Sequence, residues 1–276
     1  GRLSGFQQAE HSRGDQLNQT KTTTRFDIAY SDKGLLIGYR ERRLDSASPD
    51  MVETALWETD PHSGYNSLGQ QTGYDLTTVR TDLSTGGTLL NVTVRQEMRS
   101  LAYNQKGQLV YSDQTSRETS PDGIDAVTRE EKMGMTYDIH NRELGYRLFS
   151  WDAFGNKTET DRFHVLYDDL GRLVHTEELI DDPVKDDDAP DGLVLRRWVS
   201  WSGSNANADG QLTQTRQTEW EFDEVLAGDF DVAATPLRRE TEILRTNIRF
   251  DADGKEAGFV EHVDERFQDG SRTVRS

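Results

Sequence analysis

Cysteine is absent from this 276-residue chain, which excludes disulfides and any metal site or catalytic centre built on cysteine. Hydrophobic residues make up only 33% of it, and no apolar run is long enough to span a membrane. Segments such as Thr22–Arg25 and Arg95–Arg99 also leave no continuous apolar face, so we expect no membrane insertion. Basic residues are few: 32 Lys and Arg stand against 50 Asp and Glu, for a net charge of −18. Since phosphate backbones are bound by basic patches, this balance argues against a nucleic-acid partner.

Sequence signals of catalysis are also missing. No serine lies in a nucleophile-elbow context, and no phosphate-cradling glycine loop leads into a helix. Acidic residues are so frequent that no pair of them stands out as acid and base. His164 and His175 flank one turn, but we expect them on opposite faces of a strand pair, which argues against a zinc site. The sequence therefore predicts a protein that is not an enzyme and has no cofactor.

The chain has a repeated turn instead. Its clearest copy is Tyr167-Asp168-Asp169-Leu170-Gly171, an aromatic residue, then Asp, Asn or Ser, two variable residues, and Gly or Asn. The second residue can cap the turn through its side chain, and the last enters the left-handed backbone region at low cost. A type I turn followed by a left-handed residue closes an antiparallel hairpin through a G1 bulge. We expect such turns near 31–34, 66–69, 104–107, 138–141, 152–155, 168–171, 202–210 and 251–254, with Gly34, Gly69, Gly107, Asn141, Gly155, Gly171, Gly210 and Gly254 as the structural turn residues. Positive φ is predicted at Gly34, Gly69, Gly107, Asn141, Gly171 and Gly254.

The turn also predicts which residues face one another across the hairpin. In that register Tyr167 lies opposite Leu173, Val165 opposite His175, and Phe163 opposite Glu177. The same register places Ile28 opposite Gly38 and Ile248 opposite Gly258, so these second glycines are expected to make room for a large side chain. The turn aromatics would form a ladder on one buried face of the sheet; they are Tyr30, Tyr65, Tyr103, Tyr137, Tyr167, Trp201 and Phe250.

These elements define an all-β fold. We expect an antiparallel up-and-down meander of repeated hairpins that forms an extended, curved or spiralling sheet. Residues 1–276 would be a single repeat array of about eight units, a fragment of a larger protein, in which each repeat has the neighbouring repeats as its partners. Whether the sheet stays open, rolls into a spiral or packs against a second layer is left undecided by the sequence.

The motif YDDLGRLVHTEEL resembles the YD repeat of bacterial Rhs proteins, wall-associated proteins and animal teneurins. The recurring GYxE and GYxL endings are similar to repeat regions of giant secreted proteins related to filamentous haemagglutinins. This resemblance implies a structural or adhesive segment of a large extracellular or cell-surface bacterial protein, with a cell-surface glycan or protein as a further partner. The alternative that it implies is a shell segment of an Rhs-type toxin-encapsulating protein.

Two further stretches are candidates for binding. Asn205, Asn207 and Asp209 precede Gly210 with the spacing that starts a calcium loop, although Arg216 stands where such a loop has a bidentate glutamate. The tripeptide Arg13-Gly14-Asp15 matches an integrin-type adhesion motif on an expected turn. The acidic run with Asp186, Asp187, Asp188 and Asp191 is interpreted as a solvated loop, with a loose cation site as the alternative.

Overall fold

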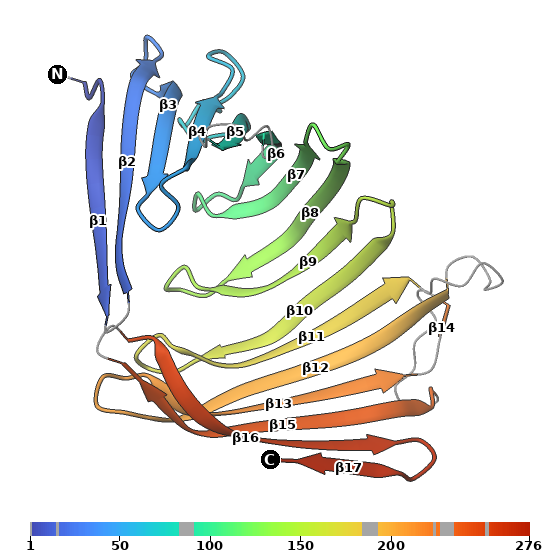
Figure 1. Cartoon of the computed structure of the whole chain (residues 1–276). Helices are drawn as coiled ribbons and strands as arrows, with labels where there is room; N and C mark the ends of the chain where they lie inside the picture. The colour runs from blue at the N-terminus through green and yellow to red at the C-terminus, as the bar shows by residue number, and fades with distance from the viewer. Residues whose placement is uncertain are drawn as a thin grey trace. The chain divides into compact units, whose positions relative to one another are not determined.

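The computed structural model describes residues 2–14, 17–82, 91–183, 193–222, 225–226, 235–251 and 254–276. These residues form strands, turns and bends and no helix, so no membrane-spanning helix is found among them (Figure 1). The chain divides into two compact units, Gly1–Glu131 with Trp151–Gly155, and Lys132–Ser150 with Asn156–Ser276.

The first unit is a sheet in which each strand pairs antiparallel with the next one along the chain, from β1 to β7. Its strands are β1 (Phe6–Gly14), β2 (Leu17–Tyr30), β3 (Leu36–Asp45), β4 (Met51–Glu58), β5 (Tyr74–Asp82), β6 (Asn91–Tyr103) and β7 (Leu109–Thr119), and β8 (Asp125–Tyr137) begins in this unit and ends in the other.

The second unit repeats this arrangement. Its strands are β9 (Glu143–Trp151), whose last residue belongs to the first unit, β10 (Lys157–Tyr167), β11 (Leu173–Pro183), β12 (Leu193–Ala206), β13 (Leu212–Phe222), the two-residue β14 (Val225–Leu226), β15 (Leu237–Phe250), β16 (Glu256–Phe267) and β17 (Arg272–Arg275). The strands pair antiparallel in chain order from β10 to β17, except that β13 pairs with β15 while β14 pairs with β12. The expected fold class, an all-β antiparallel meander of repeated hairpins, is confirmed.

The hydrophobic core is thin. Among the described residues, the buried apolar side chains are Val52, Ala55, Trp57, Met135, Val165, Val194, Phe222 and Ile248, and no large side chain there is completely shielded from solvent. Several polar or charged residues are equally buried, including Glu41 and Arg196. A sheet that buries so few apolar side chains depends strongly on its backbone hydrogen bonds and on polar pairing between strands.

The eight turn residues named from the sequence all have positive φ, between 64° at Asn141 and 84° at Gly34. In seven of the turns two backbone hydrogen bonds recur: the first turn residue donates to the carbonyl four residues on, and the Gly or Asn donates back to the first residue. In the long copy the turn itself is Asn207–Gly210, so the expected span 202–210 was too wide. Ala206 therefore occupies the aromatic position there, and Trp201 lies within β12, opposite Gln217.

A second bulge, which the sequence reasoning missed, changes the register. Three residues before the turn aromatic the backbone again has positive φ, at Asp27, Ser100, Gly134, His164 and Asn247. Because the bulge adds a residue to one strand, His175 faces Leu166 rather than Val165, Gly38 faces Ala29, and Gly258 faces Arg249. The predicted partners of these three residues were wrong, whereas Tyr167 faces Leu173 and Phe163 faces Glu177 as predicted.

At three copies of the second glycine, Gly5, Gly73 and Gly145, the role differs from the one expected. A Cβ atom at Gly145 would lie 2.6 Å from the carbonyl oxygen of Arg162, two residues before the bulge residue His164. A Cβ atom at Gly5 would lie 2.8 Å from the equivalent carbonyl oxygen of Arg25, and one at Gly73 would lie 2.8 Å from that of Met98. At these three positions glycine makes room for a backbone carbonyl beside a bulge, not for a large side chain.

Candidate functional site

Side chains at the first turn position cap the turns. The Asp168 carboxylate accepts hydrogen bonds from the backbone N–H groups of Leu170 and Arg172, both at 2.9 Å. Asn66, Asn104, Asp138 and Asn207 cap their turns in the same way. The series of turns that begin at Ser31, Asn66, Asn104, Asp138, Asp168, Asn207 and Asp251 is called the turn edge below.

The residue four positions after the cap is matched to it chemically. Asp168 and Asp138 bind Arg172 and Arg142 through Nε, both at 2.6 Å. Where the cap is asparagine, the partner is glutamine, as in Asn66–Gln70, Asn104–Gln108 and Asn207–Gln211. The Arg172 guanidinium and backbone N–H lower the pKa of Asp168, because both stabilise its ionised form.

Contacts along the turn edge join one turn to the next within each unit. The hydroxyl of Tyr65 donates to the carbonyl of Leu36 at 2.6 Å, and that of Tyr103 donates to Gln71 at 2.8 Å. Tyr167 repeats this contact on Glu143 at 2.9 Å. In each case the acceptor lies two residues after the Gly or Asn of the preceding turn.

The matched side chains reach in the opposite direction. Arg172 Nη1 donates to the carbonyl of Gly210 at 2.5 Å, and Gln211 Nε2 donates to that of Gly254 at 3.2 Å. Arg142 contacts the carbonyl of Asp168 at 3.4 Å and covers the Tyr167 ring. The turn aromatics are half-buried by such neighbours, and Trp201 is half-buried within its strand.

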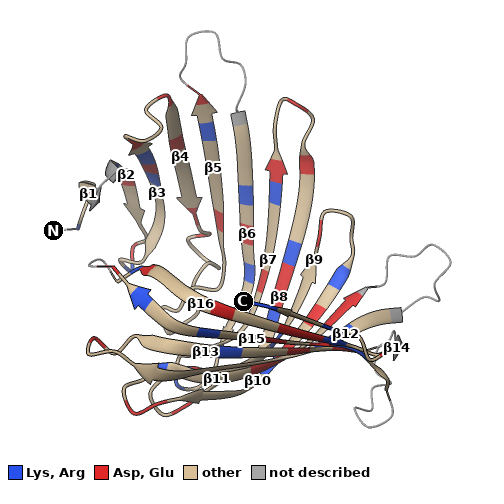
Figure 2. Cartoon of the chain, turned by 60° about the horizontal axis from the view of Figure 1, so that its bottom comes forward, with Lys and Arg blue, Asp and Glu red and all other residues tan. Residues whose placement is uncertain are grey.

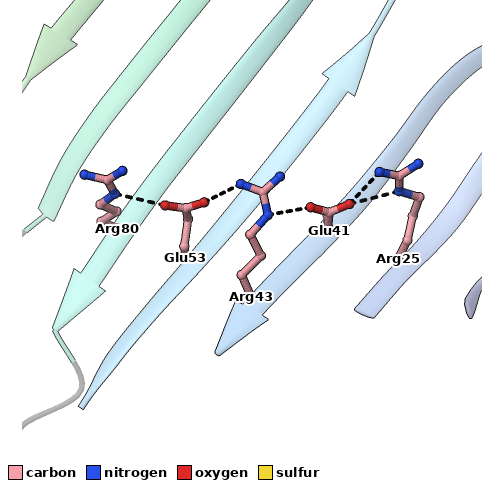
Figure 3. Close-up of polar contacts among 5 residues, drawn as sticks. All are labelled: Arg25, Glu41, Arg43, Glu53 and Arg80. Carbon is pink, nitrogen blue, oxygen red and sulfur yellow. Dashed lines mark hydrogen bonds and ion pairs between the residues drawn. The ribbon is translucent and has the colours of Figure 1, made fainter. Parts of the chain in front are cut away.

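A hollow of about 690 Å³ lies on one face of the first unit, over β1 to β5. Charged residues in its lining form a chain of ion pairs across four strands, from β2 to β5 (Figure 3). This charge row consists of Arg25, Glu41, Arg43, Glu53 and Arg80. All five side chains lie on the same face of the sheet, because Arg25 faces Glu41, Glu41 faces Ala55, Arg43 faces Glu53, and Glu53 faces Arg80.

Both carboxylates in the charge row are shared between two arginines. Arg25 reaches Oε2 of Glu41 at 2.7 and 2.9 Å, and Arg43 reaches Oε1 at 2.6 Å. Glu53 accepts from Arg43 at 2.7 Å and from Arg80 at 2.9 Å. Glu41 is only 2% exposed, and the guanidinium of Arg25 lies 3.9 Å from the centre of the Tyr39 ring. The buried carboxylate thus fixes two guanidinium groups beside the hollow.

The shared hydrogen bonds shift the pKa values of Glu53 and Arg43. Partial burial by itself would raise the pKa of Glu53, but the contacts with Arg80 and Arg43 outweigh it and lower that pKa. Burial would likewise lower the pKa of Arg43, yet its bonds to Glu41 and Glu53 raise it. Acidic and basic residues are interspersed along the strands of the molecule generally (Figure 2). The charge row combines one buried carboxylate, that of Glu41, with a place in the lining of a hollow.

Other candidates from the sequence are placed as follows. The amide oxygen of Asn207 caps its turn by accepting two backbone N–H groups, and the side-chain amide of Asn205 donates to Gln214 at 2.9 Å, so both side chains are already bonded within the hairpin. Asp209 is exposed on that turn. Asp15 and the acidic run that contains Asp186, Asp187, Asp188 and Asp191 lie outside the described residues. Within the described ranges, no group of three or more His, Cys, Asp or Glu side chains is arranged to hold a metal ion.

The expectation that His164 and His175 point to opposite faces was wrong. Both rings contact Glu177, His164 at 3.0 Å and His175 at 3.3 Å. The positive φ of His164, which forms the second bulge, breaks the alternation on which the expectation was based.

No protein-family model matches the chain, and no match to it was found among curated proteins.

Proposed function

We propose that this chain is a structural and adhesive repeat segment of a large extracellular or cell-surface bacterial protein. The observation that carries the proposal is the turn edge, where the same hydrogen bonds join successive hairpins. A repeat whose main partner is its neighbour can be added in series, and the stability of the array then becomes a sum of local contributions. Such an array extends reach and displays loops, and its resemblance to the YD repeat is consistent with this role.

Removing one repeat tests the scaffold part of the proposal. Deletion of Ser31–Tyr65 places Tyr30 directly before the Asn66 turn, which has the same backbone hydrogen bonds as the Ser31 turn. The shortened chain should fold, with a smaller denaturant dependence of the unfolding free energy in proportion to the surface lost. As a control, deletion of β3 alone reverses the direction of the next strand and should prevent folding. Failure of the first variant to fold would argue for a self-contained domain and against a repeat array.

The shell segment of a toxin-encapsulating protein is the second candidate. The charged lining of the hollow is consistent with it, because a polar surface makes no large apolar contact with an enclosed protein. The full-length gene product distinguishes the two functions: a sealing domain and a toxin domain after the repeats would support the shell, and further repeats with a surface anchor would support the scaffold.

A further inference from the structure

In the charge row every carboxylate oxygen is hydrogen-bonded, whereas some guanidinium N–H groups are not bonded to another member of the row. All four carboxylate oxygens of Glu41 and Glu53 already accept from arginine. A guanidinium carries five N–H donors, and Arg80 contacts Glu53 through Nε alone. Figure 3 shows the two Nη groups of Arg80 directed away from Glu53, and the side chain is 59% exposed. The row therefore offers hydrogen-bond donors and positive charge to a ligand, and has little to offer a cation.

The size and the lining of the hollow restrict the ligand further. About 690 Å³ is within the range of small-molecule pockets. The net charge of −18 opposes a long polyanion, whose many charges would meet the acidic remainder of the chain. A single carboxylate escapes most of that repulsion and pairs with a guanidinium in a planar, two-bond geometry.

The rest of the lining suits a sugar ring. Thr23, Gln8 and Lys21 offer partners for hydroxyl groups, and Phe6 and Met51 offer apolar surface for the C–H face of a ring. Glu10 and Asp45 also line the hollow, and Asp45 is already bonded to Gln19 at 2.6 Å. An acidic peptide would bring one charge per residue to these carboxylates, whereas an acidic sugar brings one charge among several hydroxyl groups.

We propose that the hollow over β1 to β5 binds the acidic terminal sugar of a glycan, with the sugar carboxylate paired to Arg80 and Arg43. The sugar site specifies a ligand class for the adhesive part of the proposed function, and it rests on that part. The scaffold part does not depend on it, because that part is tested by the deletion of one repeat.

The experiment is saturation-transfer NMR on the full chain with the methyl glycosides of N-acetylneuraminic acid and glucuronic acid. The carboxyl methyl esters and methyl galactoside are the uncharged controls. We expect the acids to bind and the uncharged sugars not to bind at the same concentration. Arg80→Gln should weaken binding about tenfold or more, because it removes a charge-assisted contact. Thermal unfolding should change little, since Glu53 keeps its bond to Arg43.

Arg95→Gln is the matched control variant. Arg95 is 55% exposed and ion-paired like Arg80, but it lies on the opposite face of the sheet. It should leave sugar binding unchanged. Absence of binding by both acids at millimolar concentration would overturn the inference. Equal losses of affinity for the acidic sugars in Arg80→Gln and Arg95→Gln would overturn it as well. Tighter binding of a short polyglutamate peptide than of the sugars would overturn the assignment to a glycan.

Discussion

Replacing Glu41 with glutamine measures what the buried carboxylate of the charge row contributes. The substitution keeps the shape of the side chain and removes its charge. The new amide nitrogen is a donor, so it faces the N–H groups of either Arg25 or Arg43 without an acceptor between them. Glu41 is 2% exposed, and these two arginines are 30% and 51% exposed. The arginines can therefore turn to solvent, but the group between them cannot.

The expected magnitude lies between two limits. Breaking a fully buried ion pair costs about 3–5 kcal/mol, whereas exposed pairs contribute up to about 1 kcal/mol. With one buried and two part-exposed members, we expect Glu41→Gln to lower the free energy of unfolding by about 2 kcal/mol. Glu53→Gln is the control in the same row. Because Glu53 is 20% exposed, its loss should be nearer 1 kcal/mol.

Urea unfolding followed by circular dichroism at 0.1 M and 1 M NaCl would measure both variants. Salt screens exposed charges more than buried ones, so the effect of Glu53→Gln should shrink at high salt more than that of Glu41→Gln. If both variants lower the free energy of unfolding equally, by less than about 0.5 kcal/mol, burial of Glu41 does not strengthen its ion pairs and the expected difference is refuted.

Three further outcomes are expected. Gly145→Ala should cost about 1–3 kcal/mol, because its Cβ meets a backbone carbonyl at 2.6 Å, whereas Gly258→Ala meets only a flexible side chain at 3.5 Å and should be tolerated in the same urea assay. Tyr103→Phe should cost about 1 kcal/mol, since it leaves the Gln71 carbonyl without its hydroxyl donor; no change in midpoint would remove the turn-to-turn bond as a source of stability. The Arg272 guanidinium, assisted by Arg266, lowers the pKa of Asp264 to about 2. The stability that the Asp264 carboxylate confers is therefore complete above its ordinary pKa and is lost as the pH falls through about 2. Asp264→Asn should flatten the fall of the unfolding midpoint between pH 4 and pH 2, and an unchanged slope would show that other carboxylates cause this fall.

The turns could be predicted because their causes are local. Asp168 caps backbone groups two and four residues ahead, and Gly171 adopts the left-handed conformation that such a turn requires. All of these interactions fall within five consecutive residues, so the spacing in the sequence is sufficient to define them. The alternation of β-forming residues on either side then implies antiparallel strands, which is why the fold class could be inferred.

The second bulge and the charge row were decided by tertiary structure. The bulge residues Asp27, His164 and Asn247 are of types that tolerate positive φ, but they differ from one another, so only their constant distance from the turn aromatic could have marked them. The register between the bulge and the turn differs accordingly. In the charge row, Glu41 lies 16 residues from Arg25, and Arg80 lies 27 residues from Glu53. In a chain with 50 acidic and 32 basic residues, sequence alone cannot select these partners. Strand pairing selects these partners, because it aligns their side chains on one face of β2, β3, β4 and β5. Glu41 is removed from water only once those strands lie side by side.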